Sequence, residues 1–520
     1  MGPPLSHVPY GAVGEDDPGP RRSVVLSGGG VRVSYQVGAL KALFDHGLTF
    51  RHMDGTSGGG LNLAMLLSGQ RPAEILSRWA SLESWDFLAL RPLGDYVEKR
   101  HVTAVGSPRG VTEKVLPHLG IDMERVRAAS GVDATFNLCD FSRKSNEEIP
   151  HTRMDRDLLV AGMSLPGVLP PLHRDGTYYL DSGFIQDANL MSGVRRGCEE
   201  IWLIWALGNA PDYRGGVLEL YVQMLEMSAQ GGLAFHLERI REVNRRIAID
   251  DSPYGQRRPV RLHLIRPDHP LPLDSDLYLG KVDHATLITM GYRDARRYLE
   301  TMSDEGLPLE PEITQMTPRK PGITFKEKMA GGFALGQREP EAGREAGKRA
   351  GTKLAMHATV TVDDIQRFVA DPQHQGGLAG TIDFPPLGQG IPAHDGVFNL
   401  FSPTEAPRLK LMIYEMAFER DGKQYYLAGK KEVRDDPGFD LWKDTTTLFT
   451  RLHEGTGKSG PVVGSGILTL GVADLIKLLS TVRATGTDSV KEKTEVISTF
   501  GRFFLGELWD SYVRHVPEPE

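Results

Sequence analysis

Two glycine-rich turns near the start of the chain, each leading into a helical pattern, restrict its possible folds more than any other feature. The apolar residues 24–26 read as a short buried strand that stops at Gly28–Gly30, and from Val33 apolar residues recur every three or four positions. The second turn, Gly55–Gly59, opens into the apolar segment 61–67. Strand, turn and helix in this order predict a sheet covered by helices on both faces.

The same alternation continues to about residue 302. Strands are expected at 178–180, 201–207 and 261–265, and helices at 218–247 and 291–299. We therefore predict an α/β domain over residues 22–302, preceded by an irregular N-terminal tail at 1–21.

A change of composition follows this domain. Residues 303–352 lack an apolar period and are rich in proline, glycine and charge, which predicts a linker or mobile loop. Segments 408–418 and 423–433 are rich in strand-forming residues, and the Asp421-Gly422 pair between them is typical of a type I′ hairpin. Helical patterns at 472–482 and 495–513 complete a predicted β-rich α+β domain over 353–520.

Composition excludes several classes of protein. The chain has 520 residues with 60 Lys+Arg against 68 Asp+Glu, and this mildly acidic balance disfavours a nucleic-acid protein built on a basic face. No apolar stretch reaches the roughly 18 to 20 residues that cross a bilayer. Cys139 and Cys198 are the only cysteines, which suits a reducing compartment. The first twenty residues do not resemble a signal peptide, so we expect a cytoplasmic protein.

The second turn contains a candidate nucleophile. Gly55–Gly59 fits G-x-S-x-G, in which small neighbours let a serine, here Ser57, sit on a sharp strand-to-helix turn. Backbone N–H groups of Gly28–Gly30, at a helix N-terminus, could bind an oxyanion that develops on an attacked ester carbonyl. A nucleotide site is disfavoured because the turn lacks the third glycine of G-x-G-x-x-G. The plainer alternative is a glycine-rich turn with an N-capping serine.

A serine nucleophile needs a base, and Asp181 follows a predicted strand directly. A carboxylate can accept the serine proton if partial desolvation raises its pKa toward the working pH. The alternative is a turn aspartate that caps its own backbone. In a Ser-His-Asp esterase a histidine would be the base instead, and the candidates are His173, His236, His263 and His269.

These motifs, in this order and spacing, resemble patatin-like phospholipases over roughly residues 22–300. The resemblance rests on Leu26–Arg32, Gly38–Leu40, Gly55–Gly59, Ser164–Pro166 before Pro170-Pro171, and Asp181–Gly183.

The resemblance implies a three-layer α/β/α sandwich that hydrolyses acyl esters in phospholipids and related lipids, with a Ser-Asp dyad and no metal or organic cofactor. Ser57 then corresponds to the nucleophile and Asp181 to the general base. Gly28, Gly29 and Gly30 correspond to the oxyanion loop.

The chain departs from the family pattern at three positions. Val33 replaces the glycine of G-G-G-x-[RK]-G, and Ser182 replaces the first glycine after the aspartate. The family's Asn-x-Pro is absent, and Asp187 lies near the expected Asn position. Arg32 matches the family's basic position, where it could bind a lipid phosphate or form a structural salt bridge.

Three further expectations concern partners and alternatives. Residues 353–520 loosely resemble a β-rich module that accompanies GMC-type oxidoreductases, without the flavin-binding half. The segment 236–261 holds seven arginines against four acidic residues and could contact anionic lipid surfaces, although a solvated helix face explains it as well. A lipid-binding or scaffolding protein that kept the fold and lost turnover is the alternative to an enzyme.

Overall fold

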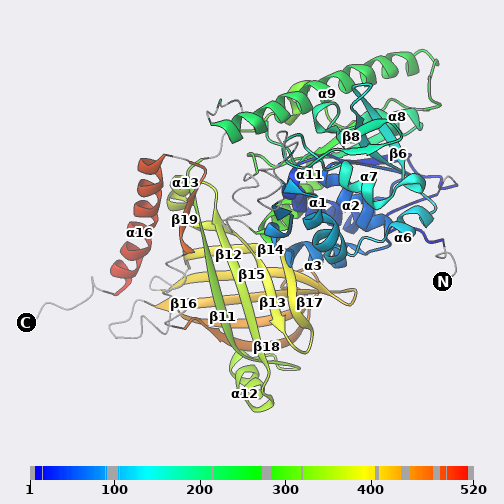
Figure 1. The fold of residues 1–520 in the computed structure, drawn as a ribbon. Helices are drawn as coiled ribbons and strands as arrows, with labels where there is room; N and C mark the ends of the chain where they lie inside the picture. Colours follow the sequence, from blue (N-terminus) through cyan, green and yellow to red (C-terminus); the bar gives the residue numbers. More distant parts are fainter. Residues whose placement is uncertain are drawn as a thin grey trace, which may run out of the picture. The chain divides into compact units, whose positions relative to one another are not determined.

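The computed structural model divides the chain into two compact units, residues 1–318 and 319–520 (Figure 1). It describes residues 6–14, 16–87, 89–90, 104, 106–209, 211, 213, 216–271, 283–317, 320–404, 409–434, 446–471, 481–487 and 489–512. The two units are described separately.

The N-terminal unit is built on a mixed sheet of eight strands in the order β10-β9-β1-β2-β5-β8-β7, with β6 also paired to β5. Five neighbouring strands run parallel, whereas β6 and β8 lie antiparallel to β5, and β7 lies antiparallel to β8. The strands are β1 (Arg22–Leu26), β2 (His52–Thr56), β5 (Asp133–Asp140), β6 (Ser145–Pro150), β7 (Leu172–Arg174), β8 (Thr177–Asp181), β9 (Glu200–Ile204) and β10 (Arg261–Ile265).

Both faces of this sheet are covered by helices. In β1, Val24 and Leu26 join the apolar core that contains α1, α2, α3 and α11, whereas Val25 joins a second core with α8 and α9. This alternation confirms the expected α/β/α arrangement of three layers. The helices are α1 (Ser34–Asp45), α2 (Gly58–Leu67), α3 (Pro72–Ala80), α8 (Leu190–Arg195), α9 (Val217–Ile247) and α11 (His284–Thr301).

Short elements join these layers. They are η1 (Gly30–Val33), η2 (Ser84–Phe87), β3 (Ala89–Leu90), β4 (Gly106–Ser107), η3 (Gly110–Val115), α5 (Leu116–His118), α6 (Met123–Ala128), η4 (His151–Arg153), α7 (Arg156–Ala161), η5 (Ser182–Phe184) and η6 (Pro311–Thr314).

The C-terminal unit is a closed antiparallel barrel, which confirms the expected β-rich domain. Strands β11 to β18 each pair with the next, and β11 also pairs with β18, so the sheet closes on itself and β19 adds to β11. The strands are β11 (Gly322–Leu335), β12 (Lys353–Val362), β13 (Gln375–Phe384), β14 (Gly388–Pro403), β15 (Leu409–Arg420), β16 (Lys423–Arg434), β17 (Thr447–Glu454), β18 (Val462–Thr469) and β19 (Arg483–Thr485), with helices α12 (Pro340–Ala350), α13 (Ile365–Ala370) and α16 (Val490–Tyr512).

The barrel core is largely apolar and contains a buried polar cluster. Alternate residues of β15, such as Met412, Met416 and Phe418, belong to the core. Among them, Lys431 Nζ lies 3.1 Å from Glu327 Oε1, and the Tyr414 hydroxyl donates to Glu327 Oε2 at 2.9 Å. The opposite charges therefore compensate each other inside the apolar core.

The prediction of a linker or mobile loop at 303–352 is wrong, because β11 and α12 lie within these residues. In β11, exposed Lys326 and Lys328 alternate with buried residues, so the strand reads as polar. Helix α12 buries Gly343 and Gly347 instead of large apolar residues: a Cβ on Gly343 would lie 2.0 Å from the Ser465 carbonyl oxygen. Such a helix has no apolar period to detect.

The predicted hairpin is present. Asp421 and Gly422 both have positive φ, of 52° and 76°, and they join β15 to β16, as a type I′ turn requires. The predicted helix at 495–513 corresponds to α16. Most of the helix predicted at 472–482 falls outside the described residues.

Candidate active site

Ser57 lies on the sharp turn between β2 and α2. Its backbone has φ 53° and ψ −127°, a conformation that non-glycine residues rarely adopt and that is typical of a nucleophile elbow. The turn requires small neighbours: a Cβ on Gly59 would lie 2.5 Å from the carbonyl oxygens of Leu26 and Ser27, and one on Gly58 would lie 2.5 Å from that of Gly30. The close approach of the two glycine turns thus explains their composition.

The structure brings Ser57 and Asp181 together. The Ser57 hydroxyl donates to Asp181 Oδ2 at 2.6 Å, and the Gly183 N–H donates to Oδ1 at 2.8 Å. Burial raises the pKa of Asp181 to about 6, although both hydrogen bonds act against the rise. Asp181 is therefore mainly a carboxylate at neutral pH with a pKa near the working range of a general base. Ser57 itself is half-buried.

The first glycine turn lies beside this pair. A Cβ on Gly28 would come within 3.3 Å of Ser57 Cβ. Hydrogen bonds hold the turn's carbonyl groups: Ser27 Oγ donates to the Gly28 oxygen at 3.0 Å, and Arg32 Nε donates to the Gly29 oxygen at 3.1 Å. Arg32 is buried and attached to the turn, an arrangement that favours its structural role over binding a lipid phosphate.

Asp187 occupies an unexpected place in this site. Both of its carboxyl oxygens accept the Gly28 N–H, at 3.1 and 3.2 Å. The Gly28 amide, expected in the oxyanion loop, is thus already hydrogen-bonded, whereas Gly29 and Gly30 remain the candidate donors of the turn. In the sequence, Asp187 lies near the expected position of the family's Asn, and no role was predicted for it.

The histidine alternatives lie elsewhere. Within the described residues, none of the four candidates is hydrogen-bonded to Ser57 or Asp181. His263 stacks on Trp202 with ring centroids 4.1 Å apart, and its Nδ1 lies 3.0 Å from the Tyr298 hydroxyl. Burial lowers the pKa of His236 and of His263 to about 4. His173 packs on Tyr178, and His269 bonds to the Thr317 carbonyl.

A buried polar network supports β2, the strand that ends just before Ser57. All of β2 is buried, although its sequence is more polar than a buried strand usually is. Asp54 accepts hydrogen bonds from Thr135 Oγ1 at 2.5 Å and Asn137 Nδ2 at 2.6 Å, and His52 Nδ1 lies 2.8 Å from Ser23 Oγ. Cross-strand partners therefore satisfy the polar side chains.

Comparison with known proteins identifies the domain that contains this site. Residues 24–193 match the family model described as patatin-like phospholipase. The N-terminal unit contains a patatin-like phospholipase domain. Lysophospholipase nte1 of Aspergillus oryzae (strain ATCC 42149 / RIB 40) is 26% identical over 307 residues, which cover 56% of this chain and 19% of that protein. The chain thus spans about a fifth of that relative's length.

A solved structure also matches, more distantly. The crystal structure of VipD from Legionella pneumophila aligns with a TM-score of 0.32 and 11% identity, and the match covers 57% of this chain and 71% of that one. Together with the family match, the mixed sheet confirms the patatin-like fold expected for the N-terminal part of the chain.

The described residues contain no group of three or more His, Cys, Asp or Glu side chains placed to hold a metal ion. No helix within the described ranges is long and apolar enough to cross a membrane.

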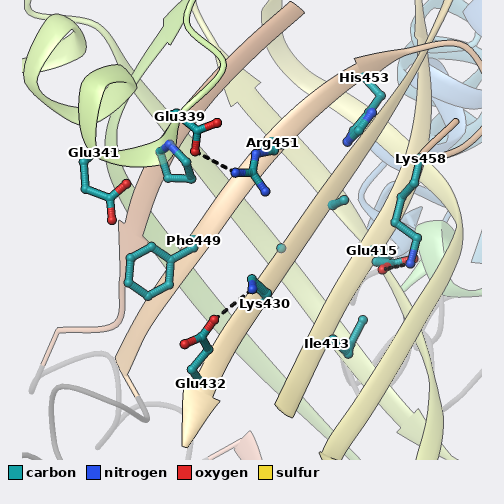
Figure 2. Close-up of a pocket in the computed structure, with 13 residues that line it drawn as sticks. Glu339, Glu341, Ile413, Glu415, Lys430, Glu432, Phe449, Arg451, His453 and Lys458 are labelled. Atoms are coloured by element: carbon teal, nitrogen blue, oxygen red, sulfur yellow. Dashed lines mark hydrogen bonds and ion pairs between the residues drawn. The ribbon is translucent and has the colours of Figure 1, made fainter. Parts of the chain in front are cut away.

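A groove of about 520 Å³ lies on the outer face of the C-terminal barrel, over β15, β16 and β17 (Figure 2). Three ion pairs line it: Lys458 lies 2.7 Å from Glu415, Lys430 lies 2.8 Å from Glu432, and Arg451 lies 2.8 Å from Glu339. The charges within each pair offset each other, and Glu341 adds a further acidic side chain to the lining.

Proposed function

We propose that the protein is a serine acyl-ester hydrolase of the phospholipase A, lysophospholipase or lipase type. Ser57 is the nucleophile and Asp181 the general base of its Ser-Asp dyad. The observation that carries the proposal is the 2.6 Å hydrogen bond between Ser57 Oγ and Asp181 Oδ2 on a strained turn of a patatin-like domain. The similarity to a lysophospholipase supports a lipid substrate.

The reaction proceeds in two halves. Ser57 Oγ attacks the ester carbonyl while its proton passes to Asp181, and the amides of Gly29 and Gly30 stabilise the oxyanion. The tetrahedral intermediate collapses, Asp181 returns the proton to the departing alcohol, and the acyl group stays on Ser57. Asp181 then takes a proton from water, whose oxygen attacks the acyl-enzyme, and the fatty acid leaves as Ser57 is reprotonated.

Hydrolysis assays on vesicles and micelles test this proposal. Purified protein is incubated with a phosphatidylcholine, a lysophosphatidylcholine and a triacylglycerol, and released fatty acid is quantified for the wild type and Ser57→Ala. We expect release from at least one lipid by the wild type and a loss of more than about 1,000-fold in the variant. Equal release by both proteins would refute the role of Ser57.

A lipid-binding or scaffolding protein without turnover is the second candidate. Ser182 replaces a family glycine beside Asp181, and the Gly28 amide is bonded to Asp187, so the site departs from the family pattern where it matters for rate. A fluorophosphonate probe separates the two. Labelling that disappears in Ser57→Ala supports the enzyme, whereas a folded wild type that stays unlabelled supports the binder.

We also propose peripheral contact of the domain with lipid surfaces, through α9. Several arginines of the segment 236–261 are paired with acidic side chains, as in Arg241–Glu238 and Arg246–Asp251. Exposed apolar side chains instead recur at helical spacing along the N-terminal part of α9. They are Val217, Met224, Met227 and Phe235, with exposed fractions of 90%, 54%, 67% and 64%.

This apolar face is close to the dyad. Ser228 on α9 donates to the carbonyl of Phe184, three residues after Asp181. Burial, and then the negative charge of Asp181, raises the pKa of Tyr221 on the same helix to about 12. Vesicle cosedimentation of Met227→Glu, with Ile249→Glu as an exposed control outside the face, tests the contact. Equal binding of the two variants would exclude contact through this face.

The free, buried cysteines suit the cytoplasmic location that we propose.

A further inference from the structure

Asp187 contacts the glycine turn directly and lies near the dyad. Its side chain is buried, with 3% exposed, and both carboxyl oxygens lie within hydrogen-bonding distance of the Gly28 N–H. A Cβ on Gly28 would lie 2.3 Å from Asp187 Oδ1, so only glycine permits this approach. Since Gly28 also lies beside Ser57, the Asp187 carboxyl holds the start of the turn whose next two amides are the proposed oxyanion donors.

Two carboxyl groups therefore share one buried site. A Cβ on Gly183 would lie 3.2 Å from Asp181 Oδ1 and 3.6 Å from Asp187 Oδ1, which places both acids around the same glycine. Two carboxylates this close do not both ionise readily in a buried site. Because the oxyanion of the reaction adds another negative charge, a charged Asp187 would oppose the transition state.

Three titratable or charged groups influence Asp187 or lie next to it: Arg32, Asp181 and His236. Arg32 on η1 favours the charged form, whereas Asp181 at the end of β8 disfavours it. His236 on α9 bonds to the backbone of Ala188, and its pKa of about 4 keeps it neutral across the working range. Burial, and then the charge of Asp181, raises the pKa of Asp187 to about 8. Asp187 is thus the member of the pair that retains its proton at neutral pH.

We propose that Asp187 is a positioning residue that holds the glycine turn through Gly28 and serves the hydrolase in its protonated form, so that its deprotonation lowers activity. The inference rests on the proposed function and adds a second titrating acid to its site. Asp181 must be ionised and Asp187 neutral, so the rate of hydrolysis is highest between the two titrations. A carboxylic acid kept neutral by an apolar site is an established means of supporting an oxyanion.

The pH dependence of kcat/KM tests the proposal with Asp187→Asn and Asp187→Ala. The wild type should lose activity below about pH 6 and again above about pH 8. Asparagine keeps an oxygen that accepts the Gly28 N–H but cannot ionise. Asp187→Asn should therefore lose less than about threefold at pH 7 and lack the alkaline decline, whereas Asp187→Ala should lose about 100-fold at all pH values because the turn is no longer held.

Asp294→Asn is the matched control. Burial raises the pKa of Asp294 as well, but this residue lies on α11, where it accepts a hydrogen bond from the Tyr35 hydroxyl at 3.1 Å instead of holding the glycine turn. This control should keep the alkaline decline of the wild type. An alkaline decline that persists in Asp187→Asn, or one that disappears in Asp294→Asn, would overturn the proposal.

A second measurement does not depend on turnover. Carbon-13 NMR of aspartate carboxyl groups in Ser57→Ala protein, with the Asp187 signal assigned by its absence from Ser57→Ala/Asp187→Asn, reports the titration directly. We expect a midpoint near pH 8. A midpoint near pH 4 would refute the protonated form of Asp187 even if the protein is an active hydrolase. A midpoint near 8 in a protein that hydrolyses no ester would refute only the proposed function.

Discussion

The Asn137 side chain on β5 donates to Asp54 Oδ1 at 2.6 Å and to Thr56 Oγ1 at 3.0 Å, and so connects a buried carboxyl to the residue that precedes Ser57. This contact attaches the end of β2 to the neighbouring strand. The position of the nucleophile therefore depends on a polar side chain that takes no part in the proposed chemistry.

Asn137→Ala should destabilise the protein by about 2 kcal/mol, because Asp54 and Thr56 both lose the buried amide group that donates a hydrogen bond to them. Urea unfolding followed by the fluorescence of buried Trp202 and Trp205 measures the loss. We expect kcat to fall more than KM rises, since the turn that holds Ser57 loosens. Thr301→Ala, an exposed position on α11, is the control and should change neither quantity. Unchanged stability in Asn137→Ala would contradict the proposed support.

Asp54→Asn should change how stability depends on pH. Because the pKa of Asp54 is raised in the folded state, its contribution is complete below about pH 4 and is lost as the pH rises through about 8. Asparagine cannot ionise, so the variant loses none of this stability between about pH 4 and 8. The variant's unfolding free energy relative to the wild type should rise between pH 4 and 8 and level off above it. A difference that is flat with pH would contradict the raised pKa.

Gly59→Ala should abolish hydrolysis, because its Cβ would collide with the backbone carbonyl oxygens of Leu26 and Ser27, just before the other glycine turn, and neither can rotate away. Gly231→Ala on α9 is the matched control, since a Cβ there meets nothing within 4 Å. The control should keep activity and gain up to about 1 kcal/mol from helix propensity. Full activity in soluble Gly59→Ala would show that the two turns do not meet as described.

The ion pair in the barrel core predicts an asymmetric pattern of stability. Lys431→Met leaves Glu327 charged and buried, and should cost about 3–5 kcal/mol in the unfolding of the C-terminal unit. Glu327→Leu combined with Lys431→Met removes both charges and should recover most of this loss. Thermal unfolding of the full chain measures both. A double variant no more stable than the single one would contradict the compensation.

Local sequence patterns predicted the parts of the fold that local physics determines. Positive φ at Asp421 and Gly422 follows from the residues themselves, and so does the close packing of glycine at the turn before α2. Closure of the barrel was not predictable, because the pairing of β11 with β18 joins segments more than a hundred residues apart and leaves no local signal.

The candidate site shows the same difference between features that local sequence predicts and contacts that depend on distant residues. The motif spacing predicted that Ser57 and Asp181 would be candidates, and the structure places them in contact. The hydrogen bond from Gly28 to Asp187 spans 159 residues and depends on the exact path of the chain after β8. The polar residues of β2 argued against a buried strand, because their partners lie on other strands. Contacts of this kind require the folded structure.

The most direct test of the central claim is detection of the acyl-enzyme. The protein is quenched within milliseconds of mixing with a slowly deacylating p-nitrophenyl ester, and peptides are analysed by mass spectrometry, with Ser57→Ala and Asp181→Asn treated alike. We predict an acyl adduct on Ser57 in the wild type, no adduct in Ser57→Ala, and a strongly slowed appearance in Asp181→Asn. An adduct on another residue, or acylation of Ser57 at the wild-type rate in Asp181→Asn, would contradict the account.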